Sequence, residues 1–506
     1  MITRRAFVAG ATAFPTIINA ASIARSPVVD STAGRIRGSA EGNLQVFRGL
    51  RYGTAERFRA PTAPKRSAGV TDALNFAPSA PQRNDKYKPQ SEDCLFLNVW
   101  TPEARRGANL PVMVYIHGGA YSTGSVVDPL NDGRHLAARD AVVVTINHRL
   151  NALGYLYLAR LDPRFPDSGN IGQLDLILAL KWIRDNIASF GGDPSRVMVF
   201  GQSGGGAKIA TMMGMPAAAG LFHRAITMSG QQVTASGPLH ATERAKAFLA
   251  KLKATPDELL RLPTEKLVDA LDASDPIMGG AVYFGPVLDM KWLTRHPFWP
   301  DANPQSNGIP MILGNTHDET RAFIPREKIV GLTWDDLPQR MAPELKVDIN
   351  PEWVVSEYRR LFPSYSPEQV FYAATTAGRS WRGQVDEAEA RSRAGAPTWV
   401  YQVDFSSPTE PWRGAPHTMD IALSFGTLDA PGSFTGTGTG ARAVSDAMMR
   451  SFTNFTATGD PDPSWPMYRL PARSTMIFNV RSHIEEDPRR EQRELFARVP
   501  YIQPGT

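Results

Sequence analysis

The sequence predicts an α/β fold, in which a central, mostly parallel, twisted sheet is flanked by helices. Six short segments have the composition of strands, and most of them are continuously apolar, which is typical of strands buried on both faces of a parallel sheet. Between two of them, residues 172–190 have apolar side chains at helical spacing and end at the Gly-Gly-Asp-Pro breaker of residues 191–194. The expected strands are residues 94–100, 111–116, 141–147, 196–200, 310–314 and 399–405.

Length and composition favour one large domain. The chain has 506 residues, of which 42% are apolar and 21% charged, as in ordinary water-soluble globular proteins. Its net charge is +5, and the basic residues are spread thinly, without a long Lys/Arg run. We therefore expect a single domain over residues 25–506 and no binding of nucleic acid.

The first 24 residues predict an export signal. Arg4 and Arg5 precede an uncharged apolar stretch that continues to Ala21, with small residues that suit a signal-peptide cleavage site. Paired arginines in this position resemble a bacterial twin-arginine signal peptide. A membrane anchor is less favoured, because Pro15 interrupts the stretch and a span needs about 20 apolar residues. We expect residues 1–24 to be a signal peptide of a periplasmic or secreted protein without a membrane span.

Ser203 follows one of the expected strands and stands between glycines. Residues 201–205 read Gly-Gln-Ser-Gly-Gly, and the small-residue stretch 206–213 follows. A strand that turns sharply into a helix on such a serine is a nucleophile elbow, in which glycine relieves crowding beside the turn. Taken alone, the pattern also fits a glycine-rich turn that caps a helix.

A second glycine-rich loop supports the catalytic interpretation. Residues 117–121 read His-Gly-Gly-Ala-Tyr and come directly after the expected strand 111–116. In serine hydrolases, backbone N–H groups of such a loop, with the N–H after the nucleophile, hold the negative oxygen of the tetrahedral intermediate. Two loops of this kind in this order favour Ser203 as a nucleophile.

A nucleophilic serine needs a base, and the base needs an acid that orients it. The expected chain order is serine, acid, histidine. Asp318 and Glu319 both follow the expected strand 310–314, so either qualifies as the acid. Of the nine histidines, His417 is the best placed base, because it follows the strand 399–405 through a loop rich in proline and glycine.

With these motifs, the chain resembles the type-B carboxylesterases, which include bacterial p-nitrobenzyl esterases, animal carboxylesterases and cholinesterases. The similar segments extend from residues 34–38 to 465–466. Two are specific: residues 92–99 match the family's second signature, and residues 190–203 match its nucleophile signature. The resemblance implies an α/β-hydrolase fold with cap-like insertions and a serine hydrolase that cleaves small carboxylic esters, with no cofactor or metal.

The resemblance also implies a role for individual positions. Ser203 would be the nucleophile and His417 the base, and Glu319, which matches the glutamate of the family's Asp-Glu-Gly motif, would be the acid. The backbone N–H groups of Gly118, Gly119 and Gly204 would form the oxyanion hole. Ser229 would be a second serine that supports the site structurally.

The sequence departs from the family pattern beside the nucleophile, where Gln202 replaces the usual glutamate. The missing negative charge argues against a cationic, choline-like substrate. Arg321 and Arg413 lie close in sequence to the expected acid and base, so one of them would bind a carboxylate on an anionic ester, unless both are simply solvated. A non-catalytic adhesion relative, a lipase and an amidase are the alternative functions. The natural ester and the oligomeric state stay open.

Overall fold

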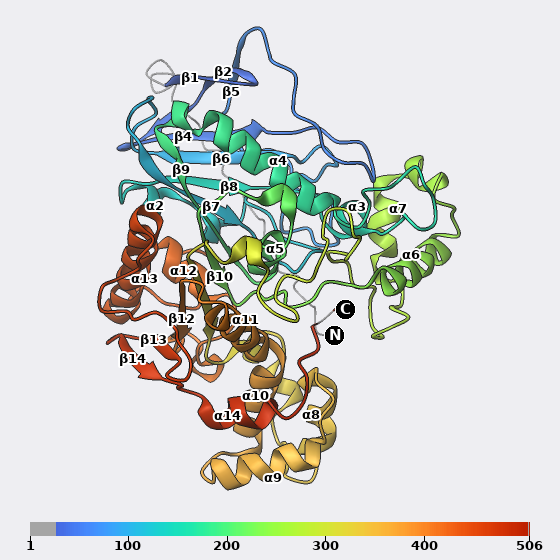
Figure 1. Ribbon diagram of the computed structural model, residues 1–506, viewed down its shortest axis with the longest axis vertical. Helices are drawn as coiled ribbons and strands as arrows, with labels where there is room; N and C mark the ends of the chain where they lie inside the picture. The colour runs from blue at the N-terminus through green and yellow to red at the C-terminus, as the bar shows by residue number, and fades with distance from the viewer. Residues whose placement is uncertain (1–26, 504, 506) are drawn as a thin grey trace, which may run out of the picture.

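The computed structural model describes residues 27–503 and residue 505 (Figure 1). Their strands form one sheet of eleven strands and a small sheet of three. The signal peptide expected at residues 1–24 lies outside the described residues and stays a prediction. Among the described residues, no helix has both the length and the hydropathy of a membrane span.

The large sheet is mixed, and its centre is parallel. Its strand order is β14-β13-β12-β11-β10-β9-β7-β8-β6-β4-β3, and every neighbouring pair from β13 to β8 is parallel. Antiparallel strands lie only toward the two edges. The predicted fold class is therefore confirmed. The bounds are β3 Ser39–Glu41, β4 Leu44–Arg51, β6 Phe96–Thr101, β7 Leu110–Ile116, β8 Val142–Ile146, β9 Gly192–Gln202, β10 Arg224–Met228, β11 Met311–Thr316, β12 Thr398–Val403, β13 Ser474–Phe478 and β14 His483–Glu486.

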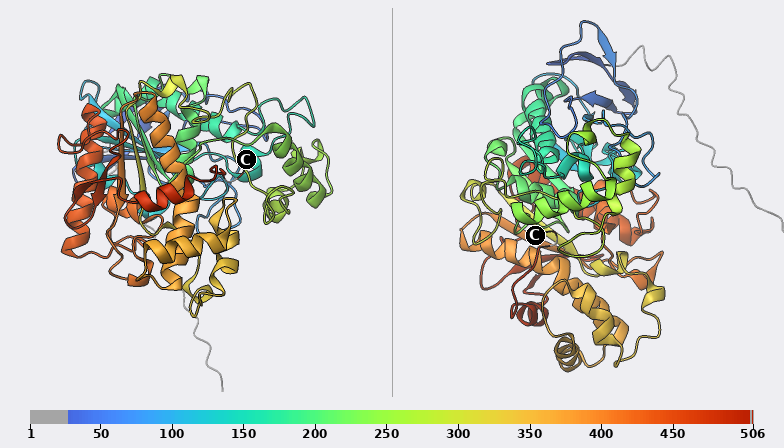
Figure 2. Two further views of the ribbon diagram at one scale, coloured as in Figure 1. Left: turned by 60° about the horizontal axis from the view of Figure 1, so that its bottom comes forward. Right: turned by 90° about the vertical axis from the view of Figure 1, so that its right-hand side faces the viewer.

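Each face of this sheet is covered by its own helices, as Figures 1 and 2 show. Along β7, Val112 and Val114 belong to one buried cluster, while Met113 and Tyr115 belong to another. Side chains alternate along a strand, so a strand that is apolar throughout needs a layer of helices on both sides. The first layer contains α4 Ile171–Asn186, α5 Gly204–Met212 and α11 Arg382–Arg393, and the second contains α2 Arg134–Ala137, α12 Met419–Phe425 and α13 Thr439–Thr458.

Two groups of helices extend beyond the sheet and form the predicted insertions (Figure 1). One packs around Phe248 and Phe284, and the other around Met341 and Tyr358. Each group has an apolar core of its own, which gives it a defined shape outside the two main layers. The first contains α6 Pro238–Leu252 and α7 Thr264–Asp269, and the second contains α8 Leu337–Leu345, α9 Pro351–Leu361, α10 Pro367–Thr376 and the C-terminal α14 Arg490–Phe496. The remaining elements are α3 Asn151–Tyr155 and the strands of the small sheet, β1 Val28–Ser31, β2 Gly34–Arg37 and β5 Val70–Asp72.

Candidate active site

Ser203 lies in the turn between β9 and α5. Its backbone has φ 55° and ψ −124°, a combination that is unfavourable for a residue with a side chain. The turn is held by the N–H of Ser203, which donates to the carbonyl oxygen of Met228 at 2.7 Å. Helix α5 begins at Gly204, and the N–H groups of a first helical turn have no partner within the helix. A strained turn therefore presents the serine beside free backbone donors.

The loop after β7 packs directly against this turn. A Cβ atom on Gly118 would lie 2.7 Å from the carbonyl oxygen of Gln202, and one on Gly204 would lie 1.9 Å from that of Ala120. Both contacts would be with backbone, which cannot easily move away. Gly119, between them, has φ +84°, a conformation that favours glycine. Glycine thus allows the two backbones to approach, and the structure brings all three expected oxyanion-hole positions together.

A buried lysine on α5 holds this loop in place through two hydrogen bonds. Its Nζ donates to the carbonyl oxygens of Ala120 at 2.9 Å and His117 at 3.2 Å. Burial lowers the pKa of this residue, Lys208, to about 7, and within the described range no carboxylate forms an ion pair with it. Burial, with Lys208 nearby, also lowers the pKa of His117 to about 3. Sequence reasoning missed Lys208, although a lysine in an otherwise small and apolar stretch was an available signal.

Glu319 is fully buried just after the end of β11. Its Oε1 accepts the hydroxyl of Ser229 at 2.5 Å, and the N–H and hydroxyl of Thr316 at 2.9 and 3.0 Å. Its Oε2 contacts Nδ1 of His417. Burial by itself raises the pKa of Glu319, but His417 and these hydrogen bonds outweigh burial and lower the pKa below its usual value. The carboxylate is therefore ionised and oriented toward the imidazole.

Asp318, which the sequence left as an alternative acid, has other partners. Its carboxylate accepts the N–H of Ala415 at 3.0 Å and lies 3.3 Å from Nε of Arg321. Ala415 belongs to the loop that leads into His417. Asp318 thus secures the loop that carries the histidine, whereas its neighbour in sequence contacts the imidazole ring itself.

His417 is buried and joins the acid to the segment that contains the serine. Its Nε2 lies 3.1 Å from the side-chain Nε2 of Gln202, the residue before Ser203. An amide nitrogen only donates, so this geometry makes Nε2 of the imidazole an acceptor and leaves the ring proton on Nδ1, toward Glu319. In the part of the chain that is described, no hydrogen bond joins His417 to Ser203. Phe323 packs on the imidazole, with 4.7 Å between ring centroids.

Two features near the imidazole were missed by sequence reasoning. Gln202 was noted only for the charge it lacks, although its amide engages the imidazole. Asp420 lies on α12 and accepts a hydrogen bond from the hydroxyl of Tyr401 at 3.1 Å. Burial and the nearby charge of Glu319 raise the pKa of Asp420 to about 7. At a pH below this pKa, Asp420 is largely neutral. Glu319 is then the charged partner of His417.

Arg321 and Arg413, for which the sequence left open either solvation or the binding of an anionic ester by one of them, are both paired within the protein. Arg413 contacts Glu410, with 2.6 Å between Nε and Oε2, and Arg321 contacts Asp318. Arg321 also donates a hydrogen bond to the backbone carbonyl oxygen of Trp412. Neither guanidinium is therefore free for a substrate carboxylate.

The comparisons agree with the chemistry of this arrangement. A model of the carboxylesterase family matches residues 25–496. The chain is 33% identical over 499 residues to the para-nitrobenzyl esterase of Bacillus subtilis, covering 92% of this chain and 98% of that protein. It is 30% identical over 493 residues to the fumonisin B1 esterase of Sphingopyxis macrogoltabida, covering 91% and 88%. A solved carboxylesterase of Geobacillus stearothermophilus superposes with a TM-score of 0.83 at 32% identity, covering 93% of this chain and 99% of the other.

Proposed function

Because this chain belongs to the carboxylesterase family and is a carboxylic ester hydrolase of the serine hydrolase type, we propose that Ser203, His417 and Glu319 carry out its reaction. The observation that supports this assignment is the buried contact between Glu319 and Nδ1 of His417. This contact leaves Nε2 of the imidazole as a proton acceptor beside the turn that holds Ser203.

The first half of the reaction forms an acyl-enzyme. Nε2 of His417 releases the amide of Gln202 and takes the proton of the Ser203 hydroxyl, while the serine oxygen attacks the ester carbonyl carbon. The carbonyl oxygen becomes an oxyanion, which the N–H groups of Gly118, Gly119 and Gly204 stabilise. The tetrahedral intermediate then breaks its bond to the alcohol oxygen, and that oxygen leaves with the proton from His417.

The second half returns the enzyme to its starting state. His417 takes a proton from a water molecule, whose oxygen attacks the acyl carbon. The bond to the Ser203 oxygen breaks, this oxygen regains the proton from His417, and the carboxylic acid departs. In both halves Glu319 stabilises the imidazolium, while Ser229 fixes the position of the carboxylate through its hydroxyl.

The assignment is tested by comparing two serines of the site. Ser203→Ala is expected to lower kcat for p-nitrophenyl butyrate by about 10⁴-fold or more, with an unchanged far-UV circular dichroism spectrum. It should also abolish the covalent adduct that an organophosphate leaves on the wild-type enzyme, as measured by mass spectrometry.

Ser229→Ala is the matched control. It removes a hydroxyl from the same site but leaves the proposed nucleophile intact, so it should keep the organophosphate adduct. Wild-type turnover by Ser203→Ala, or an adduct on a residue other than Ser203, would contradict the proposal.

A further inference from the structure

A partly buried arginine without an acid partner is separated from the proposed base by one aromatic ring. Arg379 belongs to a π-helical turn, Ala377–Trp381, that joins α10 to α11. Its guanidinium carbon lies 4.5 Å from the ring centroid of Phe323, and Phe323 in turn packs on His417. Among the described residues, Arg379 makes no hydrogen bond and no ion pair. In this part of the chain, its guanidinium contacts the aromatic face of Phe323.

Three neighbouring arginines differ from Arg379 in that each has an acid partner. Arg382, on the next helical turn, lies 3.1 Å from the carboxylate of Asp386. Arg321 and Arg413 are paired with acids, as described above. Arg321, Arg382 and Arg413 are thus each paired with a carboxylate, unlike Arg379.

The environment of Arg379 favours an incoming anion. Burial lowers the pKa of Arg379, although the charges of Glu344 and Glu319 partly offset this effect. A cation that is withdrawn from water without a counter-ion is unfavourable, and a bound carboxylate would relieve that cost. Turns of π-helix are rare and occur frequently at functional sites, where they change the direction of a side chain.

The neighbouring aromatic ring is open to a ligand. Phe323 is 42% exposed, which is unusual for a phenylalanine in contact with a buried histidine. Phe323 contacts both the imidazole of His417 and the guanidinium of Arg379, so a substrate bound against its exposed part would lie close to both. An apolar surface with a cation at its rim matches an ester that carries a carboxylate a few bonds from the reacting carbonyl.

We propose that Arg379 binds a carboxylate on the ester substrate, so that the enzyme favours esters of dicarboxylic acids or of carboxylated alcohols over neutral esters of similar size. The inference rests on the proposed function, because it places Arg379 relative to His417. It assigns to Arg379 the role that the sequence suggested for Arg321 or Arg413.

The test compares matched anionic and neutral esters. The first pair is mono-p-nitrophenyl glutarate and p-nitrophenyl valerate, which differ in a carboxylate on the acyl side. The second pair is 4-acetoxybenzoate and its methyl ester, which differ in a carboxylate on the alcohol side. Arg379→Gln should lower kcat/KM for the anionic member of at least one pair by about 10- to 100-fold, and for its neutral partner by less than about threefold. The loss should appear mainly in KM, since the carboxylate is bound before and during the reaction.

Two further variants separate binding from structure. Arg379→Lys keeps the positive charge and should recover part of the lost preference. Arg382→Gln removes a nearby charge that is already paired, so the ratio of anionic to neutral kcat/KM should stay as in the wild type. An unchanged ratio in Arg379→Gln for both pairs, or the same change in Arg382→Gln, would overturn the proposal.

The result is distinguishable from a failure of the proposed function. If Ser203→Ala still hydrolyses neutral esters, the catalytic assignment fails whatever Arg379 does. If Ser203→Ala is inactive and Arg379→Gln keeps the wild-type ratio, only the carboxylate site is wrong.

Discussion

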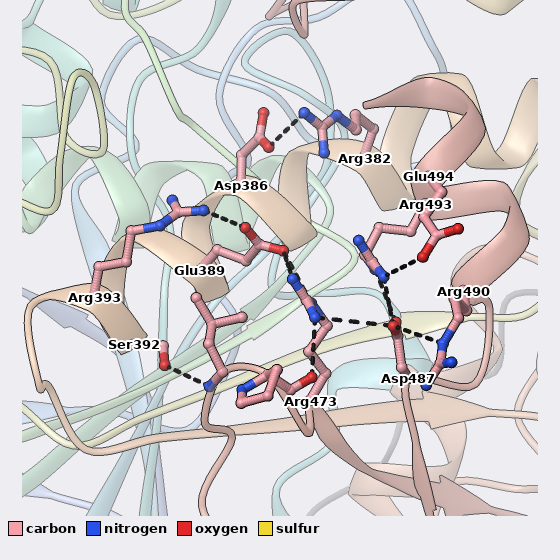
Figure 3. Close-up of polar contacts among 12 residues, drawn as sticks. Arg382, Asp386, Glu389, Ser392, Arg393, Arg473, Asp487, Arg490, Arg493 and Glu494 are labelled. Carbon is pink, nitrogen blue, oxygen red and sulfur yellow. Dashed lines mark hydrogen bonds and ion pairs between the residues drawn. The ribbon is translucent and has the colours of Figure 1, made fainter. Parts of the chain in front are cut away.

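Two clusters of polar side chains in this protein differ in whether every member has a permanent partner. The first runs from Ser229 through Glu319 to His417 and Gln202, at the ends of the central strands. The second, which we call the C-terminal clamp, is made of Glu389, Arg393, Arg473, Asp487 and Arg493 (Figure 3).

In the C-terminal clamp, each acid is shared between arginines. Oε1 of Glu389 lies 2.9 Å from Nη2 of Arg473, and its other oxygen contacts Arg393. Asp487 lies 2.6 Å from Nη2 of Arg493. These pairs join α11 and β13 to the C-terminal helix α14. Networks of this kind hold elements together and leave no reactive group, because every charge has a permanent partner.

The catalytic cluster has a carboxylate fixed at one end and an acceptor nitrogen held only by a neutral amide at the other. Glu319 accepts several donors, so its position does not change when a ligand enters. Nε2 of His417 can exchange the amide of Gln202 for a hydroxyl proton. The comparison teaches that reactivity comes from the one exchangeable partner and not from the number of charges, which is larger in the C-terminal clamp.

The strongest test of this comparison removes one carboxylate from each cluster. Glu319→Gln should lower kcat by about 10³- to 10⁴-fold on p-nitrophenyl butyrate, because the neutral amide no longer orients or stabilises the imidazolium. Glu389→Gln should keep kcat within about twofold of the wild type and lower the temperature of thermal unfolding. Similar kcat values in the two variants would show that the clusters do not differ in function.

A second test replaces the neutral amide beside His417 by a carboxylate, which can form an ion pair with the imidazole. In Gln202→Glu, a carboxylate would lie beside Nε2 of His417 and favour the protonated imidazole, which cannot accept the serine proton. We expect the acid side of the kcat/KM profile to move to higher pH, with lower activity on that side than in the wild type. The measurement is kcat/KM for a neutral ester between pH 5 and 9, with Gln202→Met as the uncharged control. A profile that coincides with the wild type would contradict the role given to this amide.

The smallest expected effect concerns Lys208, a buried cation with neither an acid nor an exchangeable partner. Burial lowers its pKa to about 7 in the folded protein, below the value of about 10.4 for an exposed lysine. Between these values the unfolded chain binds more protons, so this residue makes the free energy of unfolding rise with pH, and its destabilising effect is complete only below about pH 7.

The wild type should therefore gain about 1–3 kcal/mol relative to Lys208→Met between pH 6 and pH 9, as measured by urea unfolding. His117 and His148 do not obscure this comparison, because burial lowers the pKa of both well below this range. The lost hydrogen bonds to the loop after β7 contribute equally at both pH values. A stability difference that is independent of pH would contradict the burial of a charged lysine.

Much of the fold could be predicted from continuous apolar segments, and all six expected strands are present. The strands β10 and β13 were not predicted, because each contains polar residues within a run of only five. Their burial depends on neighbours that belong to distant parts of the chain. The presence of helical insertions was predicted, but their positions were not. Helices α8 to α10 pack on one another and not on the sheet.

By itself, the sequence determined the local geometry around the serine. Glycines at 118 and 204 permit backbone contacts that a side chain would prevent, and a buried strand before Ser203 sets the direction of the turn. These are steric consequences of short segments. The position after the strand left Asp318 and Glu319 open, and the family resemblance implied Glu319. The tertiary structure adds the contact of Glu319 with His417, and it alone decided which of the arginines near the site have an acid partner. Such contacts join residues about a hundred or more positions apart, or depend on every neighbour at once, and local pattern carries no information about them.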